Sequence, residues 1–455
     1  MAAERKSVRE RLRRDALDIF RAGVAAVDPH RAVSRCVELD GDHLRVDPGQ
    51  GDAVSLDLRA FDRVLVVGAG KATARMAQAL EDLLGERLDG GVIVVKHGHT
   101  APLRLVDQIE ASHPVPGEDG VRGVGRVLAL LADADEHTLV FALISGGGSA
   151  LLPQPAEGIR LEDKRFLTRQ LLAAGADIRE INAVRKHISS VKGGQLALHA
   201  HPARVVSLVL SDVVGDPLDD IASGPLVPDR STFADAVEVL RQRRLWDEAP
   251  ASIRGHLEAG LSGRRGETPK PGDPRFEKMT IALVGTNRRC LRACRERAKS
   301  LGWNTRLLSD TVVGEASEVA RELAAHARSV VTGGGVVAAP ACLLSGGEPT
   351  VTIRGGGLGG RNQELALAAA LEIEGQDRIA IASLGTDGND GPTDAAGAIA
   401  FGDSVVRGRE NSMDARQHLR KNDAYPFFDR LGDLVRTGPT GTNVMDVHVV
   451  LVADD

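Results

Sequence analysis

The 455-residue sequence is poor in aromatic residues and in cysteine, and it carries no excess of positive charge. Aromatics make up 3% of the residues, so the stacking surfaces of single-stranded nucleic-acid binders are missing. The formal net charge is −6, which leaves no broad basic field for polyanions, and we expect no nucleic-acid partner. The four cysteines are too few and too scattered for a disulfide framework and indicate a reducing compartment.

Long apolar runs are also absent from the sequence. No segment is long enough to span a bilayer, and residues 1–29 carry acidic residues where a signal peptide has its apolar core. We therefore expect a cytoplasmic protein with no membrane partner. Hydrophobic residues make up 42% and charged residues 26%, which is ordinary for a globular protein, and the length predicts two or three domains.

Short apolar runs alternate with glycine-rich or acidic loops and with amphipathic stretches. This order is typical of buried parallel strands in an α/β protein. The expected strands lie at residues 63–68, 91–96, 138–145, 204–211, 279–285, 349–355, 378–385 and 447–453. Residues 261–278 are rich in Gly, Pro and charge and predict a domain boundary. The expected division is an N-terminal domain of residues 1–265, a linker of residues 266–276 and a C-terminal α/β domain of residues 277–455.

The first informative loop, "VVGAGKATAR", follows the strand at 63–68. It resembles a dinucleotide fingerprint through Gly68 and Gly70, but Thr73 stands where the third glycine belongs, and the loop also fails as a Walker motif. What remains is a tight turn that places Lys71 at a helix N-terminus, where a phosphate or carboxylate is favoured. A solvated lysine on a first helical turn is the alternative interpretation.

A second glycine loop follows the strand at 138–145. Gly146, Gly147 and Gly148, between Ser145 and Ser149, allow backbone N–H groups to converge on an oxyanion. The G-x-S-x-G elbow of serine hydrolases is not met, and a tight turn with no ligand stays open as an alternative.

A basic amphipathic stretch, "INAVRKHISSVKGGQLA", contains Arg185 and Lys192. It predicts either a further anion contact or a solvated cationic face. His97, His99 and His113 lie in two nearby loops, and their spacing favours capping or substrate hydrogen bonding over a zinc site.

Acidic loops follow two other strands. Asp212 opens "SDVVGD", and Asp387 and Asp390 lie in "GTDGNDGPTDAAG", which lacks the ligand spacing of an EF-hand. Loose carboxylates beside glycine loops suit Mg²⁺, which takes one or two protein carboxylates plus phosphate oxygens, although turn chemistry alone would also explain them.

The stretch "LLSGGEPTVTIRGGGLGGRNQE" combines the expected strand at 349–355 with a run of glycines. Gly359 and Gly360 precede Arg361, which begins a predicted helix and offers a fixed fork for phosphate or carboxylate. We expect the glycines to let the backbone approach a small, highly anionic ligand. The loop "RTGPTGTN", with Thr440, could close over the same ligand.

These motifs together resemble the class II glycerate kinases, the glycerate 2-kinases whose C-terminal part is the MOFRL domain. The resemblance runs from about Val64 to Val452 in a constant order, through "GAGKA", "SGGGSALL", "INAVRKHISSVKGGQLA", "SDVVGD", "SGP", "GGRNQE", "GTDGNDGPTDAAGA" and "TGPTGTN". Two departures stand out, because Gly117 replaces an acid of the family pattern HPVPD and Met445 replaces a common Asn.

The resemblance implies a Rossmann-like N-terminal domain with a parallel sheet and a C-terminal MOFRL-type α/β domain, with the active site in the cleft between them. It implies transfer of the γ-phosphoryl group of ATP to the 2-hydroxyl of D-glycerate with Mg²⁺, and it assigns the active-site lysine and arginine to Lys71 and Arg361. The expected metal ligands are Asp387 and Asp390. The expected substrate- and nucleotide-binding residues are Gly68, Gly70, Ser145, Gly146, Gly147, Gly148, Ser149, Arg185, Lys192, Asp212, Gly359, Gly360, Glu364, Thr386, Asp387 and Thr440.

Other functions stay open at this point. The first glycine turn could serve an NAD(P)H-dependent hydroxypyruvate reductase, but Thr73 and the lack of a ribose-binding acid after the strand at 91–96 argue against it. A kinase of a related small hydroxy acid and a non-catalytic sensor are further alternatives. We allow for a homodimer, about which the motifs say nothing.

Overall fold

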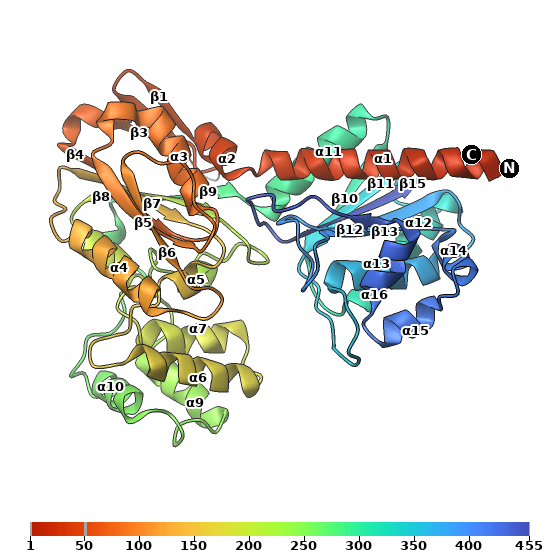
Figure 1. The fold of residues 1–455 in the computed structure, drawn as a ribbon. Coiled ribbons are helices and arrows are strands. Elements are labelled where there is room, and N and C mark those ends of the chain that lie inside the picture. Colours follow the sequence, from red (N-terminus) through yellow and green to blue (C-terminus); the bar gives the residue numbers. More distant parts are fainter. Residues whose placement is uncertain (1, 50–51, 455) are drawn as a thin grey trace. The chain divides into compact units, whose positions relative to one another are not determined.

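The computed structural model describes residues 2–49 and 52–454, which fold into two compact units (Figure 1). The first is Pro29–Val284. The second combines the chain up to Asp28 with the chain from Gly285 onward. This division differs from the expected domains of 1–265 and 277–455, because the first helix joins the C-terminal unit and the strand at 279–285 joins the N-terminal sheet. No helix in the described part of the chain has the length and apolarity needed to cross a membrane.

The N-terminal unit is built on a six-stranded sheet of order β6-β5-β4-β7-β8-β9. The chain runs outward from β4 through β5 to β6, then returns to β7 beside β4, which is the order of a doubly wound nucleotide-binding sheet. The pairings from β6 through β8 are parallel, and β7 is buried at every position. The strands are β4 (Arg63–Ala69), β5 (Gly90–Lys96), β6 (Val106–Ala111), β7 (Thr138–Ile144), β8 (Arg204–Leu210) and β9 (Met279–Gly285).

Helices and a small antiparallel sheet complete this unit. The small sheet comprises β1 (Val37–Asp40), β2 (His43–Val46) and β3 (Val54–Asp57). Four helices, α6 (Leu161–Ala173), α7 (Ile178–His187), α9 (Phe233–Gln242) and α10 (Ala251–Leu261), share an apolar core of their own and form a helical region beside the sheet (Figure 1). The remaining helices are α2 (Pro29–Cys36), α3 (Thr73–Leu84), α4 (Glu118–Leu131), α5 (Gly148–Leu151) and α8 (Gln195–Ala200).

The C-terminal unit has a mixed six-stranded sheet of order β10-β11-β15-β12-β13-β14. Only β10 and β11 pair in parallel among its described pairings, and the others are antiparallel. The strands are β10 (Asn304–Val312), β11 (Ala341–Gly347), β12 (Ile379–Gly385), β13 (Gly397–Phe401), β14 (Leu434–Val435) and β15 (Asp446–Val452). The helices are α1 (Ala2–Ala26), α11 (Asn287–Ser300), α12 (Ala316–Val331), α13 (Arg361–Glu372), α14 (Ser404–Glu410), α15 (Ala415–Arg420) and α16 (Ala424–Leu431).

Helix α1 packs along α11 and explains why the chain start belongs to this unit. A Cβ on Gly23 would lie 2.4 Å from the Cys294 sulfur and 2.8 Å from that of Cys290, so only glycine permits so close a helix crossing. Both cysteines are fully buried, which confirms that their i, i+4 spacing marks a buried helix face.

The expected strand at 349–355 is wrong. Residues 352–354 are exposed there, and the segment makes only an isolated bridge between Thr350 and Glu315. The strand lies earlier, as β11, where "ACLLSGG" pairs with β10 on one side and β15 on the other. The expected strand at 279–285 forms, but as the edge of the first sheet.

Candidate active site

The loop after β4 is held against the loop after β7. The Lys71 backbone N–H donates to the Gly146 carbonyl at 2.9 Å, and the Ala72 N–H donates to the Ser145 hydroxyl at 3.1 Å. Thr73 Oγ1 also lies 3.1 Å from the same hydroxyl, so the residue that breaks the dinucleotide fingerprint bonds the neighbouring loop. A Cβ on Gly70 would lie 2.0 Å from Ser145 Oγ, which explains the glycine. The Lys71 ammonium makes no hydrogen bond within the described residues.

The glycine turn after β7 is surrounded by side chains from other loops. Gly147 has φ +82°, and a Cβ there would lie 2.9 Å from the His113 ring and 3.5 Å from Lys71 Cε. A Cβ on Gly146 would lie 2.3 Å from the Asp212 carboxylate. The structure thus brings Lys71, His113 and Asp212, from the loops after β4, β6 and β8, around the glycine turn after β7. The strand order reverses between β4 and β7, and their carboxyl ends are the ligand-binding position of this fold.

The His113 ring, which lies beside Lys71, is unprotonated at neutral pH. Burial lowers the pKa of His113 to about 4, and the nearby charge of Lys71 acts in the same direction. His99 donates from Nδ1 to the Lys71 carbonyl at 3.1 Å, and burial also lowers its pKa. Both rings are therefore neutral at physiological pH and serve as hydrogen-bonding groups.

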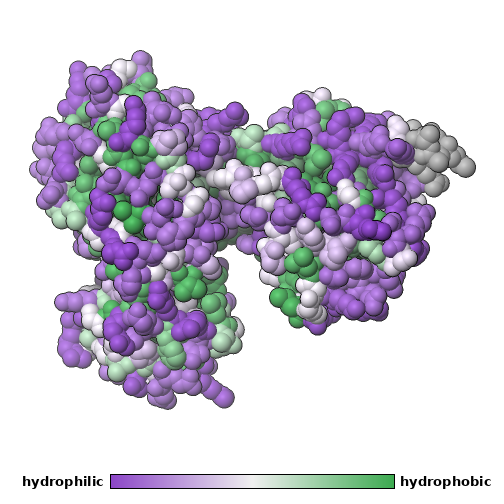
Figure 2. All heavy atoms as spheres, in the orientation of Figure 1, coloured by the Kyte–Doolittle hydropathy of each residue, from purple (hydrophilic) through white to green (hydrophobic). Residues whose placement is uncertain are grey.

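A cavity of about 660 Å³ opens from the Gly147 turn toward α6 and α7. Its apolar wall includes Pro114, Val115 and Leu172, and Figure 2 shows apolar residues exposed among hydrophilic ones over this helical region. Its polar lining is mainly cationic. The basic residues are His113, Lys164, Arg165, Arg169, Arg185 and Lys192.

Three of these cations are withdrawn from water. Lys164 is 7% exposed, and burial lowers its pKa to about 7, assisted by the charge of Arg185. Burial likewise lowers the pKa of Arg185, and it holds the pKa of Lys192 well below its usual value, with Lys164 and Arg185 adding to the effect. Lys192 donates to the carbonyl and hydroxyl of Ser149 at 2.7 and 3.0 Å, which links the predicted basic stretch to the second glycine loop.

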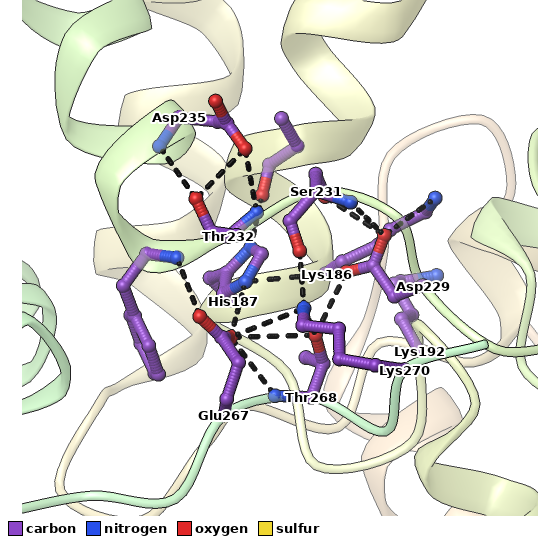
Figure 3. A network of polar contacts seen from close by, with 12 residues as sticks. Lys186, His187, Lys192, Asp229, Ser231, Thr232, Asp235, Glu267, Thr268 and Lys270 are labelled. Atoms are coloured by element: carbon purple, nitrogen blue, oxygen red, sulfur yellow. Dashed lines mark hydrogen bonds and ion pairs between the residues drawn. The ribbon is translucent and has the colours of Figure 1, made fainter. Parts of the chain in front are cut away.

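Helix α7, which carries Arg185, is held at its C-terminal end by a polar network (Figure 3). Lys186 pairs with buried Asp229 at 3.1 Å, and His187 Nε2 lies 2.8 Å from Glu267. Thr268 donates to the second Asp229 oxygen at 3.0 Å. This network anchors the end of α7 to the segments at 229–232 and 267–270, and it neutralises Lys186, the neighbour of Arg185 in the sequence.

In the C-terminal unit, Arg361 begins α13 and forms a bidentate ion pair with Asp446. Its Nε and Nη2 donate to the carboxylate at 2.6 and 3.0 Å, and Nη1 donates to Glu348 at 2.8 Å. Burial opposes the charge, but the hydrogen bond and charge of Asp446 raise the pKa of Arg361 above its ordinary value. Within the described residues, two of its five N–H groups are left for a ligand.

Asp390 anchors α13. Its carboxylate accepts from the backbone N–H of Asn362 at 3.0 Å and of Gln363 at 2.8 Å, and it is 2% exposed. Burial raises its pKa to about 6. Both oxygens serve the helix N-terminus, so Asp390 acts as a cap of α13, and its expected role as a metal ligand stays a prediction. No cluster of three potential metal-binding side chains occurs in the described part of the chain.

The glycine run before α13 packs against its own chain. A Cβ on Gly355 would lie 2.4 Å from the Lys421 carbonyl, and one on Gly357 would lie 2.5 Å from Asp423 Cβ. A Cβ on Gly360 would meet Asp390 Oδ1 at 2.3 Å. At these three positions the close approach is therefore intramolecular. This packing accounts for glycine at these positions, and the expected approach of the run to a ligand stays a prediction.

The other predicted residues of this unit lie in tied loops. Thr440 donates to the Thr386 carbonyl at 2.6 Å, and its N–H donates to the Asp387 carbonyl at 3.2 Å. Glu364 is buried and accepts from Asn422, and Gly359 packs near Ala424. Lys164 was not predicted, because "LEDKRFLTRQ" has the pattern of an ordinary amphipathic helix.

Fold and site together define an α/β protein with a doubly wound sheet and a cavity lined by basic side chains. A family model described as a domain of unknown function, DUF4147, matches residues 15–258, and the MOFRL family model matches residues 341–446. The D-glycerate 2-kinase of Thermotoga maritima is 40% identical, over 97% of this chain and 99% of the relative. The chain belongs to this glycerate 2-kinase family.

A solved structure and a further relative extend the comparison. The crystal structure of glycerate kinase from Thermotoga maritima superposes with a TM-score of 0.86 at 39% identity, covering 98% of this chain and 100% of that one. A putative hydroxypyruvate reductase of Agrobacterium vitis is 41% identical over 98% of this chain and 95% of its own.

Proposed function

We propose that this chain is a glycerate 2-kinase, which transfers the γ-phosphoryl group of ATP to the 2-hydroxyl of D-glycerate and yields 2-phosphoglycerate and ADP. The observation that carries the proposal is the likeness, over nearly the whole chain, to a D-glycerate 2-kinase. The cationic cavity at the strand ends supports it, because both substrates and both products are anions.

Phosphoryl transfer requires mainly positioning and neutralisation of charge, because its transition state is loose and carries little covalent chemistry for the protein. Lys71 suits this task. Its ammonium has no partner among the described side chains, and it lies beside the Gly147 turn. We assign Lys71 to the transferring phosphoryl group, where its charge offsets the charge on the equatorial oxygens.

Arg361 suits the recognition of a carboxylate or phosphate. Asp446 and Glu348 hold its guanidinium in one orientation, so its remaining N–H groups point in fixed directions. Such preorganisation avoids the entropy cost of ordering a long side chain when the ligand binds.

Magnesium enters as the counter-ion of ATP. Asp390 is occupied by α13, whereas Asp387 is half-buried and accepts one hydrogen bond, from the Asn389 N–H at 3.0 Å. Mg²⁺ commonly takes one or two protein carboxylates and completes its shell with phosphate oxygens and water. We therefore propose Mg-ATP as the co-substrate, with Asp387 as the one predicted carboxylate whose geometry still suits the ion.

The decisive experiment incubates the full-length protein with Mg-ATP and D-glycerate and identifies the product by phosphorus NMR. We expect 2-phosphoglycerate. A 3-phosphoglycerate signal would refute the assigned hydroxyl while keeping the kinase.

A matched pair of variants tests Lys71. Lys71→Met is expected to lower turnover on the order of a hundredfold or more, since removal of one transition-state charge partner has that effect. Lys278→Met removes the same charge from an exposed position of the same unit and should leave turnover unchanged. Equal turnover in the two variants would remove Lys71 from the mechanism.

The reductase named among the relatives is tested in a parallel sample with NADH and hydroxypyruvate. The fold has the doubly wound order of dinucleotide-binding sheets, but Thr73 occupies the third glycine position and is tied to Ser145. We expect no NADH consumption, and consumption without phosphoglycerate formation would replace the kinase by the reductase.

A further inference from the structure

The cavity between the Gly147 turn and helices α6 and α7 is lined by three basic side chains that no described carboxylate pairs. Lys164 donates only to the backbone carbonyls of Pro153 and Gln154, at 3.0 and 3.3 Å. Lys192 donates only to Ser149. Arg185 makes no hydrogen bond or ion pair within residues 2–49 and 52–454. None of the three has a carboxylate partner in that range.

Three acids of this region, Asp163, Asp229 and Glu162, lie beside other basic side chains. Asp163, next to Lys164 in the sequence, pairs with Arg160 at 2.9 Å and accepts from Ser252 at 2.7 Å. Asp229 pairs with Lys186. The one acid that lines the cavity is Glu162, and its carboxylate lies 3.9 Å from Arg165.

Buried charges in proteins are normally paired, because an uncompensated ion in a low-dielectric interior costs several kcal/mol. Three basic side chains around one cavity have no carboxylate partner among the described residues, and burial lowers the pKa of both lysines. They therefore indicate a ligand whose negative charge favours their protonated forms. Such a ligand has to be a polyanion small enough for about 660 Å³. Of the two substrates of the proposed reaction, only ATP is a polyanion.

We propose that this cavity is the nucleotide site, with the phosphates of ATP against Lys164, Arg185 and Lys192 and the base against the apolar wall. The assignment rests on the proposed kinase function. It adds Lys164 to the nucleotide-binding residues and gives Arg185 and Lys192 a defined ligand.

The size and walls of the cavity support ATP over glycerate. Pockets of roughly 300–1,000 Å³ enclose ligands with several rings, whereas a three-carbon acid would leave most of this cavity filled with water. Val115 is 61% exposed and Leu172 58% exposed, and both line the cavity. Exposed apolar side chains at a cavity wall are what the flat face of a base covers. Gly147 lines the same cavity and lies beside Lys71, so one end of the bound phosphates reaches the proposed transfer site.

A pair of arginine substitutions on α7 tests the proposal. Arg185→Gln removes the unpaired guanidinium, and Arg179→Gln removes the same charge from an exposed position two turns earlier on the helix. Because Arg185 makes no hydrogen bond or ion pair within the described residues, its replacement removes no polar contact that stabilises the fold. Lys164→Met serves as an independent second variant with nearly the same side-chain length.

Binding is measured by titration calorimetry with a non-hydrolysable Mg-ATP analogue, and the KM for D-glycerate is measured beside it. We expect Arg185→Gln and Lys164→Met each to weaken nucleotide binding about tenfold or more, which is the usual effect of losing one charge-assisted hydrogen bond. The Arg179→Gln protein should bind like the wild type, and the KM for D-glycerate should change little in all three. Thermal unfolding of unliganded Arg185→Gln should match the wild type.

The outcomes separate this assignment from the kinase proposal. If the wild type phosphorylates glycerate and both cavity variants bind nucleotide normally, the nucleotide site lies elsewhere and the kinase stands. If the variants lose glycerate affinity with nucleotide binding intact, the cavity holds the acid and the assignment is overturned. If the wild type binds the analogue in a manner sensitive to Arg185 but phosphorylates no glycerate, the site assignment stands and the kinase proposal fails.

Discussion

Replacing Arg361 is expected to destabilise the protein as well as to impair activity. Asp446 is 0% exposed, and its carboxylate accepts two hydrogen bonds from Arg361 and none from any other described side chain. Removing one partner of a buried ion pair costs about 3–5 kcal/mol, because the other charge is left buried and unpaired. The Arg361 side chain is 34% exposed, so water can partly solvate the abandoned carboxylate, and we expect a loss of about 3 kcal/mol in Arg361→Met.

A double-mutant comparison separates the two effects. Asp446→Asn in the Arg361→Met background removes the unpaired charge, so the unfolding free energy should recover by about 2 kcal/mol while turnover stays low. Unfolding is followed in guanidinium chloride with separate probes for the two units, since two units need not unfold in one transition. Arg430→Met, an exposed substitution in the same unit, is the control.

Two results would refute this reasoning. If Arg361→Met unfolds like the wild type, the ion pair with Asp446 contributes nothing to the fold. If the double variant regains turnover, the arginine acts only by neutralising Asp446, and its assignment to the ligand is wrong.

Three more predictions test other parts of the two sites. Gly147→Ala has to adopt φ +82° with its Cβ 2.9 Å from His113, so we expect kcat/KM to fall about tenfold, and an unchanged value would contradict the packing. Because burial lowers the pKa of Lys164 to about 7, a polyanion beside it should raise that pKa, so binding of the ATP analogue at about pH 8 takes up protons. Calorimetry in buffers of different ionisation enthalpy detects this uptake, and Lys164→Met should reduce it. Asp390→Ala should cost about 1–2 kcal/mol through loss of the α13 cap. Burial raises the folded-state pKa of Asp390 to about 6. The contribution of Asp390 to the free energy of unfolding is therefore largest below its unfolded-state pKa and decreases as pH rises through 6. The difference in unfolding temperature between wild type and variant should narrow from pH 5 to pH 7.

The N-terminal site could be predicted because its signals are local. The runs at 63–68 and 138–145 are short, apolar and followed by glycine, and they form β4 and β7, each nearly or wholly buried. Loops that follow parallel strands lie at the same edge of a sheet, which explains why Lys71 and the Gly146–Gly148 turn are neighbours. The hydrogen bond between Lys71 and Gly146 is the contact that makes them so.

The C-terminal sheet was harder to predict because its pairing partners are distant in the sequence. "PTVTIRG" alternates polar and β-branched residues like a strand, yet no neighbour covers Ile353, which is 81% exposed. The strand is instead "ACLLSGG", whose small residues have poor β-propensity but lie between β10 and β15, where pairing on both sides decides the conformation. The glycines that follow pack closely against residues near 421–424 and against Asp390, where a side chain would not fit. No local sequence pattern reveals these contacts.

The distribution of acids, more than that of bases, identifies the proposed nucleotide cavity. In the sequence Lys164 follows Asp163, and Arg185 precedes Lys186, so each cation looks like part of a mixed, solvated helix face. The fold turns Asp163 toward Arg160 and binds Lys186 to Asp229, and it leaves Lys164 and Arg185 facing one cavity without a counter-ion. Buried basic side chains without a counter-ion lower the stability of the folded protein, and a bound anionic ligand offsets this loss. It follows that nucleotide should stabilise the wild type against unfolding more than it stabilises Arg185→Gln, and equal stabilisation of the two proteins would show that Arg185 contributes nothing to nucleotide binding.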